Sequence, residues 1–462
     1  MNLLIQLKQT TSVFLVAFAL ACFGHLSTVQ AVSPAPDGGY PGGNTAEGQA
    51  ALLSLTTGRY NTAVGIFALR NDTTSSFNTA LGAGALLANT ADENTATGAG
   101  ALLSNTNGMQ NTANGAFALF SDTIGQLNTA LGDRALFRNT TGSANVASGW
   151  EALEINTTGN ENTATGASAL AANTNGNDNT ATGASALESN THGSQNTANG
   201  SGTLFFNTTG SGNTANGFDA LLSNDTGFNN TASGYQALHS NSAGFENTAV
   251  GYQALFNCTG AGNTAVGYLA GQNLTTGNDN IDIGNDGVAG DAGIIRIGRS
   301  FIGATYIAGI FGVTASGGTA VYVNSSGQLG TATSSARFKE DIKPMDKASE
   351  AILALKPVTF RYKKEIDSKG IPQFGLVAED VEKVNRDLIV RDKEGKPYSV
   401  RYDQVNTMLL NEFLKEHRIV QEQGATIMRL QKQIDALTAG LQKVSAQLEV
   451  SKSAPRTVLN NQ

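Results

Sequence analysis

The chain has 462 residues, of which 14% are charged, 40% are hydrophobic and 54 are glycine. An ordinary soluble domain has roughly 25% charged residues and roughly 7% glycine, so this composition argues against one ordinary globular domain. The hydrophobic fraction is too high for a disordered polar chain. The first 334 residues carry 7 Lys and Arg against 19 Asp and Glu, so they form no basic patch, and we expect no nucleic-acid partner.

Residues 1–31 have the features of a secretory signal peptide. Lys8 precedes an apolar run over residues 13–23, and Val29-Gln30-Ala31 places small side chains at the two positions that a signal peptidase reads. An uncleaved anchor fits less well, because a bilayer span requires roughly 20 apolar residues. We therefore predict cleavage at the end of this tripeptide, a linker over residues 32–43, and a secreted or cell-surface protein with no membrane span after removal of the signal.

The sequence offers no pattern typical of a metal or cofactor site. Cys258 is the only cysteine left after removal of the signal, so we interpret it as a small buried residue without a disulfide partner. The four histidines lack the spacing of metal ligands. Asp279, Asp282, Asp286 and Asp291 lie in a Gly- and Asn-rich stretch but lack the nonapeptide pattern of calcium-binding rolls, so we predict solvated turn residues there. We expect neither a metal nor a cofactor.

The tripeptide Asn-Thr-Ala, or a close variant, recurs 15 times at spacings of 17 residues, twice shortened to 16. The copies begin at Asn44, Asn61, Asn78, Asn94, Asn111, Asn128, Asn145, Asn162, Asn179, Asn196, Asn213, Asn230, Asn247, Asn263 and Asn280. A glycine follows four positions after each asparagine, and most copies continue with a small residue and leucine, as in Ala68-Leu69. This period is too short for two helices, whereas short strands joined by Asn- and Gly-rich turns fit it.

We therefore predict a parallel β-solenoid over residues 44–290, with one repeat per coil and about 15 coils. The recurring glycine would supply a positive φ or a close approach between coils. The recurring Asn and Thr side chains would form ladders, each hydrogen-bonded to its counterpart one coil away. Strands about 4.8 Å apart would give a rod of roughly 70 Å. Such a rod suits a spacer or a display surface better than a catalytic pocket.

The unit Asn-Thr-Ala-x-Gly-x-x-Ala-Leu resembles the head repeats of trimeric autotransporter adhesins, whose coils are usually shorter. The resemblance implies a parallel β-roll in which three chains pack around one axis. Candidate ligands of the rod are a cell-surface glycan or a protein, between which the sequence does not choose. A structural shaft with no binding role of its own fits the repeats equally well.

Residues 291–333 are predicted to form a β-rich neck, with apolar strands at Ile294–Ile297, Tyr306–Ile310 and Val321–Val323. The segment Ser334-Ser335-Ala336-Arg337-Phe338-Lys339 follows this neck. A serine hydroxyl becomes a nucleophile when a base takes its proton, and a lysine amine can be that base where burial keeps it neutral. A surface loop in which the lysine forms salt bridges is the alternative.

This segment resembles the Ser-Asp-x-Arg-x-Lys start of the C-terminal intramolecular chaperone domain of phage endosialidases and tail fibres, a self-cleaving serine peptidase. Similar motifs follow in order at Leu355–Tyr362, Phe374–Val381 and Val400–Val405, so the resemblance covers roughly residues 334–450. We predict the domain itself over residues 334–405. The resemblance implies that it trimerises, helps the upstream β-fibre to fold and is then released.

The resemblance also assigns roles to individual residues. Ser334 corresponds to the nucleophile and Lys339 to its general base, and the bond that is cut once per chain is Ser334–Ser335. Ser335 stands where the family has Asp. Arg337 would orient the loop or pair with one of the acidic residues that follow it.

Residues 406–450 are predicted to form a helix and a coiled coil, followed by a disordered tail over residues 451–462. Apolar residues alternate spacings of 3 and 4 from Ile427 onward, as a coiled-coil seam requires. The seam residues are Val420, Ile427, Leu430, Ile434, Leu437, Leu441, Val444 and Leu448. Their mixture does not fix the number of chains, so a trimer follows from the resemblance. A single amphipathic helix packed on its own domain is the alternative.

Three functions are compatible with this sequence. The first is a secreted homotrimeric bacterial fibre whose chaperone domain is released by autoproteolysis. The second is an adhesin that keeps this domain as a permanent trimer clamp. The third is an enzyme acting on polysaccharide, for which the low-charge repeats offer no evident pair of catalytic carboxylates. In each case we expect a mainly β fold: a β-solenoid, a neck and a small α+β domain ending in a trimeric coiled coil.

Overall fold

The computed structural model describes residues 40–302, 304–308, 310 and 316–452. The predicted signal peptide, most of the predicted linker and most of the predicted tail lie outside these residues. The chain divides at Tyr306 into two compact units, and each is described by itself.

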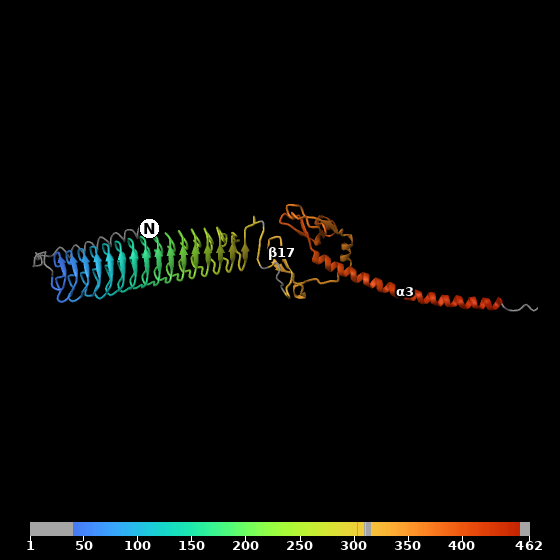
Figure 1. Cartoon of the computed structure of the whole chain (residues 1–462), viewed down its shortest axis with the longest axis horizontal. Coiled ribbons are helices and arrows are strands. Elements are labelled where there is room, and N and C mark those ends of the chain that lie inside the picture. The colour runs from blue at the N-terminus through green and yellow to red at the C-terminus, as the bar shows by residue number, and fades with distance from the viewer. Residues whose placement is uncertain (1–39, 303, 309, 311–315, 453–462) are drawn as a thin grey trace, which may run out of the picture. The chain divides into compact units, whose positions relative to one another are not determined.

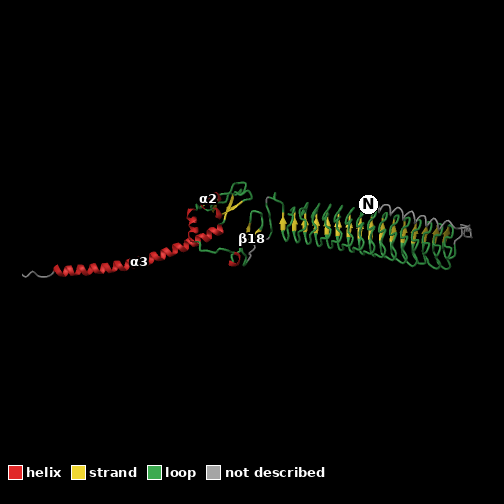
Figure 2. Ribbon diagram, turned by 180° about the vertical axis from the view of Figure 1, so that it is seen from behind, coloured by secondary structure: helices red, strands yellow, loops and turns green. Residues whose placement is uncertain are grey.

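The N-terminal unit is built on one parallel β-sheet of 16 strands, which follow one another in chain order (Figures 1 and 2). The strands are β1 (Thr45–Glu47), β2 (Thr62–Val64), β3 (Thr79–Leu81), β4 (Thr95–Thr97), β5 (Thr112–Asn114), β6 (Thr129–Leu131), β7 (Val146–Ser148), β8 (Thr163–Thr165), β9 (Thr180–Thr182), β10 (Thr197–Asn199), β11 (Thr214–Asn216), β12 (Thr231–Ser233), β13 (Thr248–Val250), β14 (Thr264–Val266), β15 (Ile281–Ile283) and β16 (Ile295–Ile297). After each strand the chain turns back and lays the next strand beside it. The predicted parallel β-solenoid is therefore confirmed.

Each coil contributes the same few side chains to the interior of the rod. The middle residue of every strand from β1 to β14 is a buried alanine, and its two neighbours lie nearer the surface. Because Ala63 pairs with Ala80 and Thr62 with Thr79, these alanines form a continuous row. A second buried pair, such as Ala68-Leu69, follows the strand in most coils. The interior is thus thin and consists mainly of alanine and leucine.

The asparagine before each strand forms the ladder that the repeats predicted, and all 15 copies are buried. The Oδ1 atom of Asn128 accepts a hydrogen bond from the backbone N–H of Asn145 at 3.0 Å. Its Nδ2 atom donates to the carbonyl of Gly142 at 2.9 Å. Both polar atoms of the buried Asn128 amide are therefore paired, as is usual for buried polar groups. The turn threonines also bond to their counterparts, as Thr140 does when its hydroxyl donates to the carbonyl of Thr157.

A left-handed leucine in each coil is a feature that the sequence did not predict. The core leucines from Leu52 to Leu255 all have φ between 48° and 55°. A bulky residue in this region costs roughly 1–2 kcal/mol. Burial of the side chain offsets this cost, and so does a hydrogen bond between coils, such as that from the N–H of Leu69 to the carbonyl of Ala85 at 3.0 Å.

The last strand of the rod falls in the segment that we predicted as neck. β16 pairs parallel to β15, with Ile281 opposite Ile295 and Ile283 opposite Ile297. The repeat signature is lost here because Ile294 replaces the ladder asparagine, but its N–H still donates to the Oδ1 atom of Asn280 at 3.1 Å. The backbone pairing of the solenoid therefore extends one strand beyond its sequence pattern.

The C-terminal unit contains three antiparallel hairpins and short helices. Its elements are β17 (Val321–Val323), β18 (Leu329–Thr331), the 3₁₀ helices η1 (Ala336–Phe338) and η2 (Asp346–Ala354), β19 (Val358–Phe360), β20 (Gln373–Gly375), α2 (Ala378–Val384), the 3₁₀ helix η3 (Arg386–Leu388), β21 (Ile389–Arg391), β22 (Pro397–Val400) and α3 (Tyr402–Lys452). Its small core consists of Val381, Leu388, Ile389, Val400 and Met408. The strand that we predicted at Tyr306–Ile310 was wrong, since the described residues there are not extended in a sheet.

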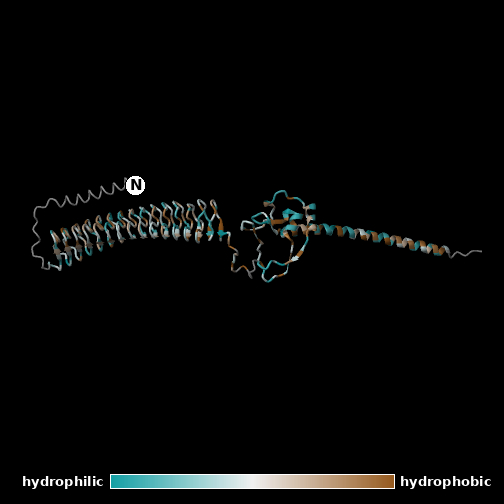
Figure 3. Cartoon of the chain, turned by 90° about the horizontal axis from the view of Figure 1, so that it is seen from above, coloured by the Kyte–Doolittle hydropathy of each residue, from teal (hydrophilic) through white to brown (hydrophobic). Residues whose placement is uncertain are grey.

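Helix α3 has 51 residues and includes the whole of the helix predicted over residues 406–450. Figure 3 shows apolar residues recurring along it among hydrophilic ones. The seam residues from Val420 to Leu448 are between 48% and 70% exposed in the single chain. Over the part of the chain that the structure describes, no helix combines the length and the apolar character needed to cross a bilayer.

Candidate functional site

The loop after β18 brings the two predicted catalytic residues together. Ser334 lies in this loop, Ser335 precedes the single turn of η1, and Lys339 ends that turn. Because the turn reverses the chain, the Nζ atom of Lys339 lies 3.3 Å from the Oγ atom of Ser334. This is hydrogen-bond distance for an amine and a hydroxyl, slightly longer than the roughly 2.6–3.2 Å typical of a nucleophile and its general base.

Backbone bonds hold this loop in shape. The carbonyl of Ser335 accepts from the N–H of Phe338 at 3.0 Å, and the carbonyl of Ala336 accepts from the N–H of Lys339 at 3.1 Å. Arg337 places its guanidinium 4.5 Å from the centre of the Phe338 ring. This cation–π contact takes the place of the ion pair with an acidic neighbour that we had considered.

Solvent surrounds the Ser–Lys pair in the single chain. Ser334, Ser335 and Lys339 are all exposed. A lysine amine is a base only when it is neutral, and burial is what favours the neutral amine. The single chain therefore supplies the separation of the two groups but not their burial.

A second Ser–Lys contact lies inside the C-terminal unit, and sequence reasoning missed it. Ser349 of η2 is fully buried, and its Oγ atom contacts Glu412, Asn411 and Lys415 of α3. The Asn411 Nδ2 atom donates to it at 2.7 Å. More than 60 residues separate these partners, so no local motif could reveal the cluster.

This second cluster fastens η2 to α3 and is not a nucleophilic site. A hydrogen bond from its amine to Glu412 raises the pKa of Lys415, and the ion pair with Glu350 acts in the same direction. The amine therefore keeps its proton and cannot take one from Ser349.

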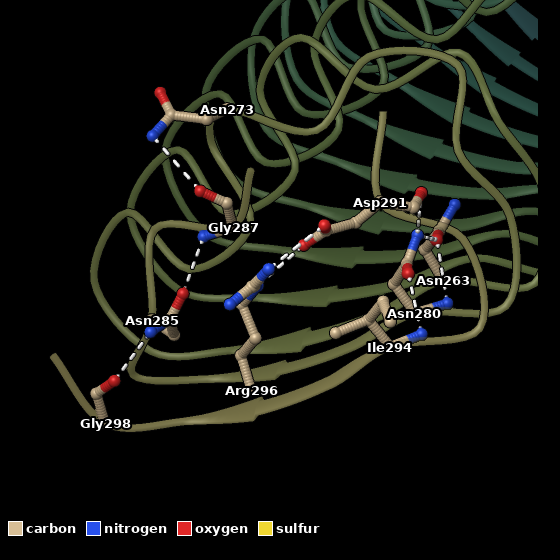
Figure 4. Close-up of polar contacts among 9 residues, drawn as sticks. All are labelled: Asn263, Asn273, Asn280, Asn285, Gly287, Asp291, Ile294, Arg296 and Gly298. Atoms are coloured by element: carbon tan, nitrogen blue, oxygen red, sulfur yellow. Dashed lines mark hydrogen bonds and ion pairs between the residues drawn. The ribbon is translucent and has the colours of Figure 1, made fainter. Parts of the chain in front are cut away.

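Three of the four acidic residues at the end of the rod differ from our expectation of solvated turns, whereas Asp279 is exposed as expected. Arg296 donates to both carboxylate oxygens of Asp291, at 2.6 and 3.0 Å (Figure 4). Asp286 pairs with Arg299. Asp282 occupies the position of the core alanine and is buried, and this burial raises its pKa to about 6. Within the described residues, no cluster of three or more His, Cys, Asp or Glu side chains could hold a metal ion.

Comparison with known protein families finds one match, within the C-terminal unit. Residues 334–390 match the model of a peptidase family described as chaperone of endosialidase. The match begins at Ser334 and includes Lys339, η2, the hairpin of β19 and β20, and α2. It confirms the resemblance that the motifs indicated, and the β-solenoid upstream agrees with the resemblance of the repeats to adhesin heads. No curated protein matches the chain.

Proposed function

We propose that this protein is a secreted homotrimeric bacterial fibre whose C-terminal chaperone domain drives trimerisation and folding and is then released by autoproteolysis. The observation that carries the proposal is the coincidence of two findings. The family match begins at Ser334, and the amine of Lys339 lies within hydrogen-bond distance of the hydroxyl of that residue. The rod would then be the mature part, which displays a surface for a glycan or a protein ligand.

The chemistry of release is a single hydrolysis per chain. Lys339 would accept the proton of the Ser334 hydroxyl as that oxygen adds to the carbonyl carbon of the Ser334–Ser335 bond. The bond to nitrogen then breaks, the proton passes to the leaving amine of Ser335, and an ester remains for water to hydrolyse. Water completes the reaction and leaves a carboxyl end on the rod. Because both groups are exposed in the single chain, the proposal places cleavage after assembly, when neighbouring chains cover the pair.

Exposed apolar residues support self-association of the C-terminal unit. A groove of about 500 Å³ is lined by Leu355, Phe374, Leu376 and Leu409, among others. The Phe374 side chain is 84% exposed, and the seam of α3 is exposed along its length. A lone helix in water is marginal unless it buries an apolar face. Three copies packed along α3 would bury this seam.

The test is the mass of the denatured chains after expression of residues 32–462. We expect the wild type to yield a rod ending at Ser334 and a fragment of residues 335–462, whereas Ser334→Ala and Lys339→Met stay whole. Ser325→Ala is the matched control, because Ser325 is an exposed serine of the same unit outside the pair. It should be cut like the wild type.

The alternative is an adhesin that keeps the domain as a permanent clamp. The exposure of Ser334 and Lys339 in the single chain favours it. If the wild type stays whole in soluble, folded trimers, the pair is not a working dyad and this alternative replaces autoproteolysis.

A further inference from the structure

A second ladder of polar side chains runs inside the rod, one residue per coil. We call it the inner ladder, and its members are Asp72, Asn89, Asn105, Asp122, Asn139, Asn156, Asn173, Asn190, Asn207, Asn224, Asn241 and Cys258, all fully buried. The amide Nδ2 of each asparagine from Asn156 to Asn241 donates to the Oδ1 atom of the preceding member, at 2.7–2.9 Å. From Asn139 to Asn241 the ladder therefore has one direction, in which each amide donates to the member before it.

Asp122 interrupts this pattern because a carboxylate has no hydrogen to donate. Its Oδ1 atom accepts from the Nδ2 atom of Asn139 at 2.7 Å, as an asparagine would. Its Oδ2 atom takes the place of the missing amide nitrogen and has no hydrogen-bond partner. The Oδ1 atom of Asn105, the preceding member, is also buried without a partner. Two buried acceptors are thus left unsatisfied at adjacent positions of the ladder.

We propose that a proton resides on the Oδ2 atom of Asp122 and that this neutral carboxyl group donates a hydrogen bond to the Oδ1 atom of Asn105. One proton satisfies both unpartnered atoms and restores the direction of the ladder. An ionised Asp122 would instead place a buried negative charge beside a second acceptor, with no cation to compensate it.

The surroundings of Asp122 support the neutral form. The groups that bond to its carboxyl are the side-chain amide of Asn139 from the next coil and the backbone N–H of Gly125. Both are uncharged, and no charged side chain contributes to the shift of its pKa. Burial raises the pKa of Asp122 to about 7, although hydrogen bonds from Asn139 and the N–H of Gly125 act against this rise.

The same rule explains a third unpartnered atom. The Oδ1 atom of Asn241 has no hydrogen-bond partner, and the next member of the inner ladder is Cys258. The thiol accepts from the Nδ2 atom of Asn263 at 3.4 Å. Burial raises the pKa of Cys258, so it keeps the hydrogen that can be donated backward to Asn241. A weak donor thus continues the ladder where the amides end.

The bound proton makes the stability of these coils depend on pH in a defined direction. In the unfolded chain Asp122 has its ordinary pKa of 3.8, and in the folded rod the pKa is about 7. Between these values the folded state holds one more proton than the unfolded state. The stabilisation is therefore complete below about pH 4 and is lost as the pH rises through about 7. The equilibrium constant for opening should increase about tenfold per pH unit in this window.

The experiment compares the full chain with its Asp122→Asn variant by hydrogen exchange of peptides covering β5 to β7, between pH 4.5 and 8.5. The amide that this substitution introduces would donate to Asn105 and accept from Asn139, as every regular member does. We expect the ratio of wild-type to variant opening constants to rise about tenfold per unit up to about pH 7 and then to level. A ratio that stays constant with pH overturns the proposal.

Two controls separate this effect from a general change of charge. Asp133→Asn removes one exposed carboxylate on the next coil, so its profile should run parallel to that of the wild type. In addition, the infrared difference between wild type and Asp122→Asn at pH 6 should contain the carbonyl band of a protonated carboxyl group. A difference spectrum that shows only carboxylate bands contradicts the proposal.

Discussion

At the scale of single residues, the rod depends on glycines that no other residue can replace. Gly115 has a φ of 146°, and a Cβ atom there would lie less than 3.0 Å from the carbonyl of Gly132. Both causes that we predicted for the recurring glycine, a positive φ and a close approach between coils, hold at this position. Since the obstacle is backbone, no side-chain movement can relieve it.

We therefore expect Gly115→Ala to lower the free energy of unfolding of the rod by about 2–4 kcal/mol. Thermal unfolding followed by circular dichroism would show this as a lower midpoint. Gly424→Ala is the matched control, because Gly424 lies in α3 with open space around it. That change should leave the rod transition unmoved and strengthen the helix by up to about 1 kcal/mol. Equal midpoints for Gly115→Ala and the wild type would contradict the argument.

The residues that could be predicted are those whose local preference agrees with the fold. Asparagine, threonine and glycine recur at turns and strand ends, so their spacing predicted the strands, their parallel orientation and the ladder. The leucines could not be placed, because a leucine near φ 50° contradicts its own preference and depends on contacts between coils. Ser349 could not be found either, since its partners lie in a distant helix.

At the scale of elements, α3 leaves its apolar seam exposed to solvent in the single chain. The heptad pattern shows which residues of α3 form the seam, because this requires only local spacing in the sequence. The pattern does not show how many chains assemble, because that number depends on how seams from different chains pack. The contact of Ser349 with Glu412 and Lys415 fastens the start of α3 to the domain that matches the chaperone family.

A charge placed in the seam should prevent assembly. We expect Leu437→Asp in the Ser334→Ala background to weaken self-association more than tenfold, because each chain would bury a carboxylate in the coil. Sedimentation equilibrium measures this directly. Ala439→Asp is the matched control: it adds the same charge two residues away, outside the seam, and should assemble like its parent. Equal association of the two variants would show that the seam is not the interface.

At the scale of the whole molecule, folding of the rod depends on contacts between neighbouring coils. Strand pairing in the rod repeatedly joins residues that are 17 positions apart in the sequence. The alanines and asparagines of a coil are buried only when the neighbouring coil is in place. Partly formed coils expose unpaired strand edges, which invite aggregation. A terminal unit that aligns chains would shorten this exposure, which is the physical reason for a chaperone at the end of a fibre.

A chain that ends at Ser334 tests this role. We expect it to accumulate in the insoluble fraction, because residues 335–462 are absent while the rod folds. The full chain carrying Ser334→Ala should be soluble, as should the rod that the wild type releases after folding. Soluble and equally folded protein from the shortened chain would show that the rod needs no chaperone.

The two short coils reveal how the rod can change in length. Asn89 lies five residues before Asn94, whereas the usual separation of these two ladder positions is six, and the same loss recurs before Asn263. The flanking strands nevertheless keep their register, because the missing residue belongs to a turn. Each coil presents the same pairing edge to the next, so recombination between repeats of the gene can insert or remove a whole coil without disturbing its neighbours. The length of the rod can therefore evolve in steps of about 4.8 Å while the C-terminal unit stays the same.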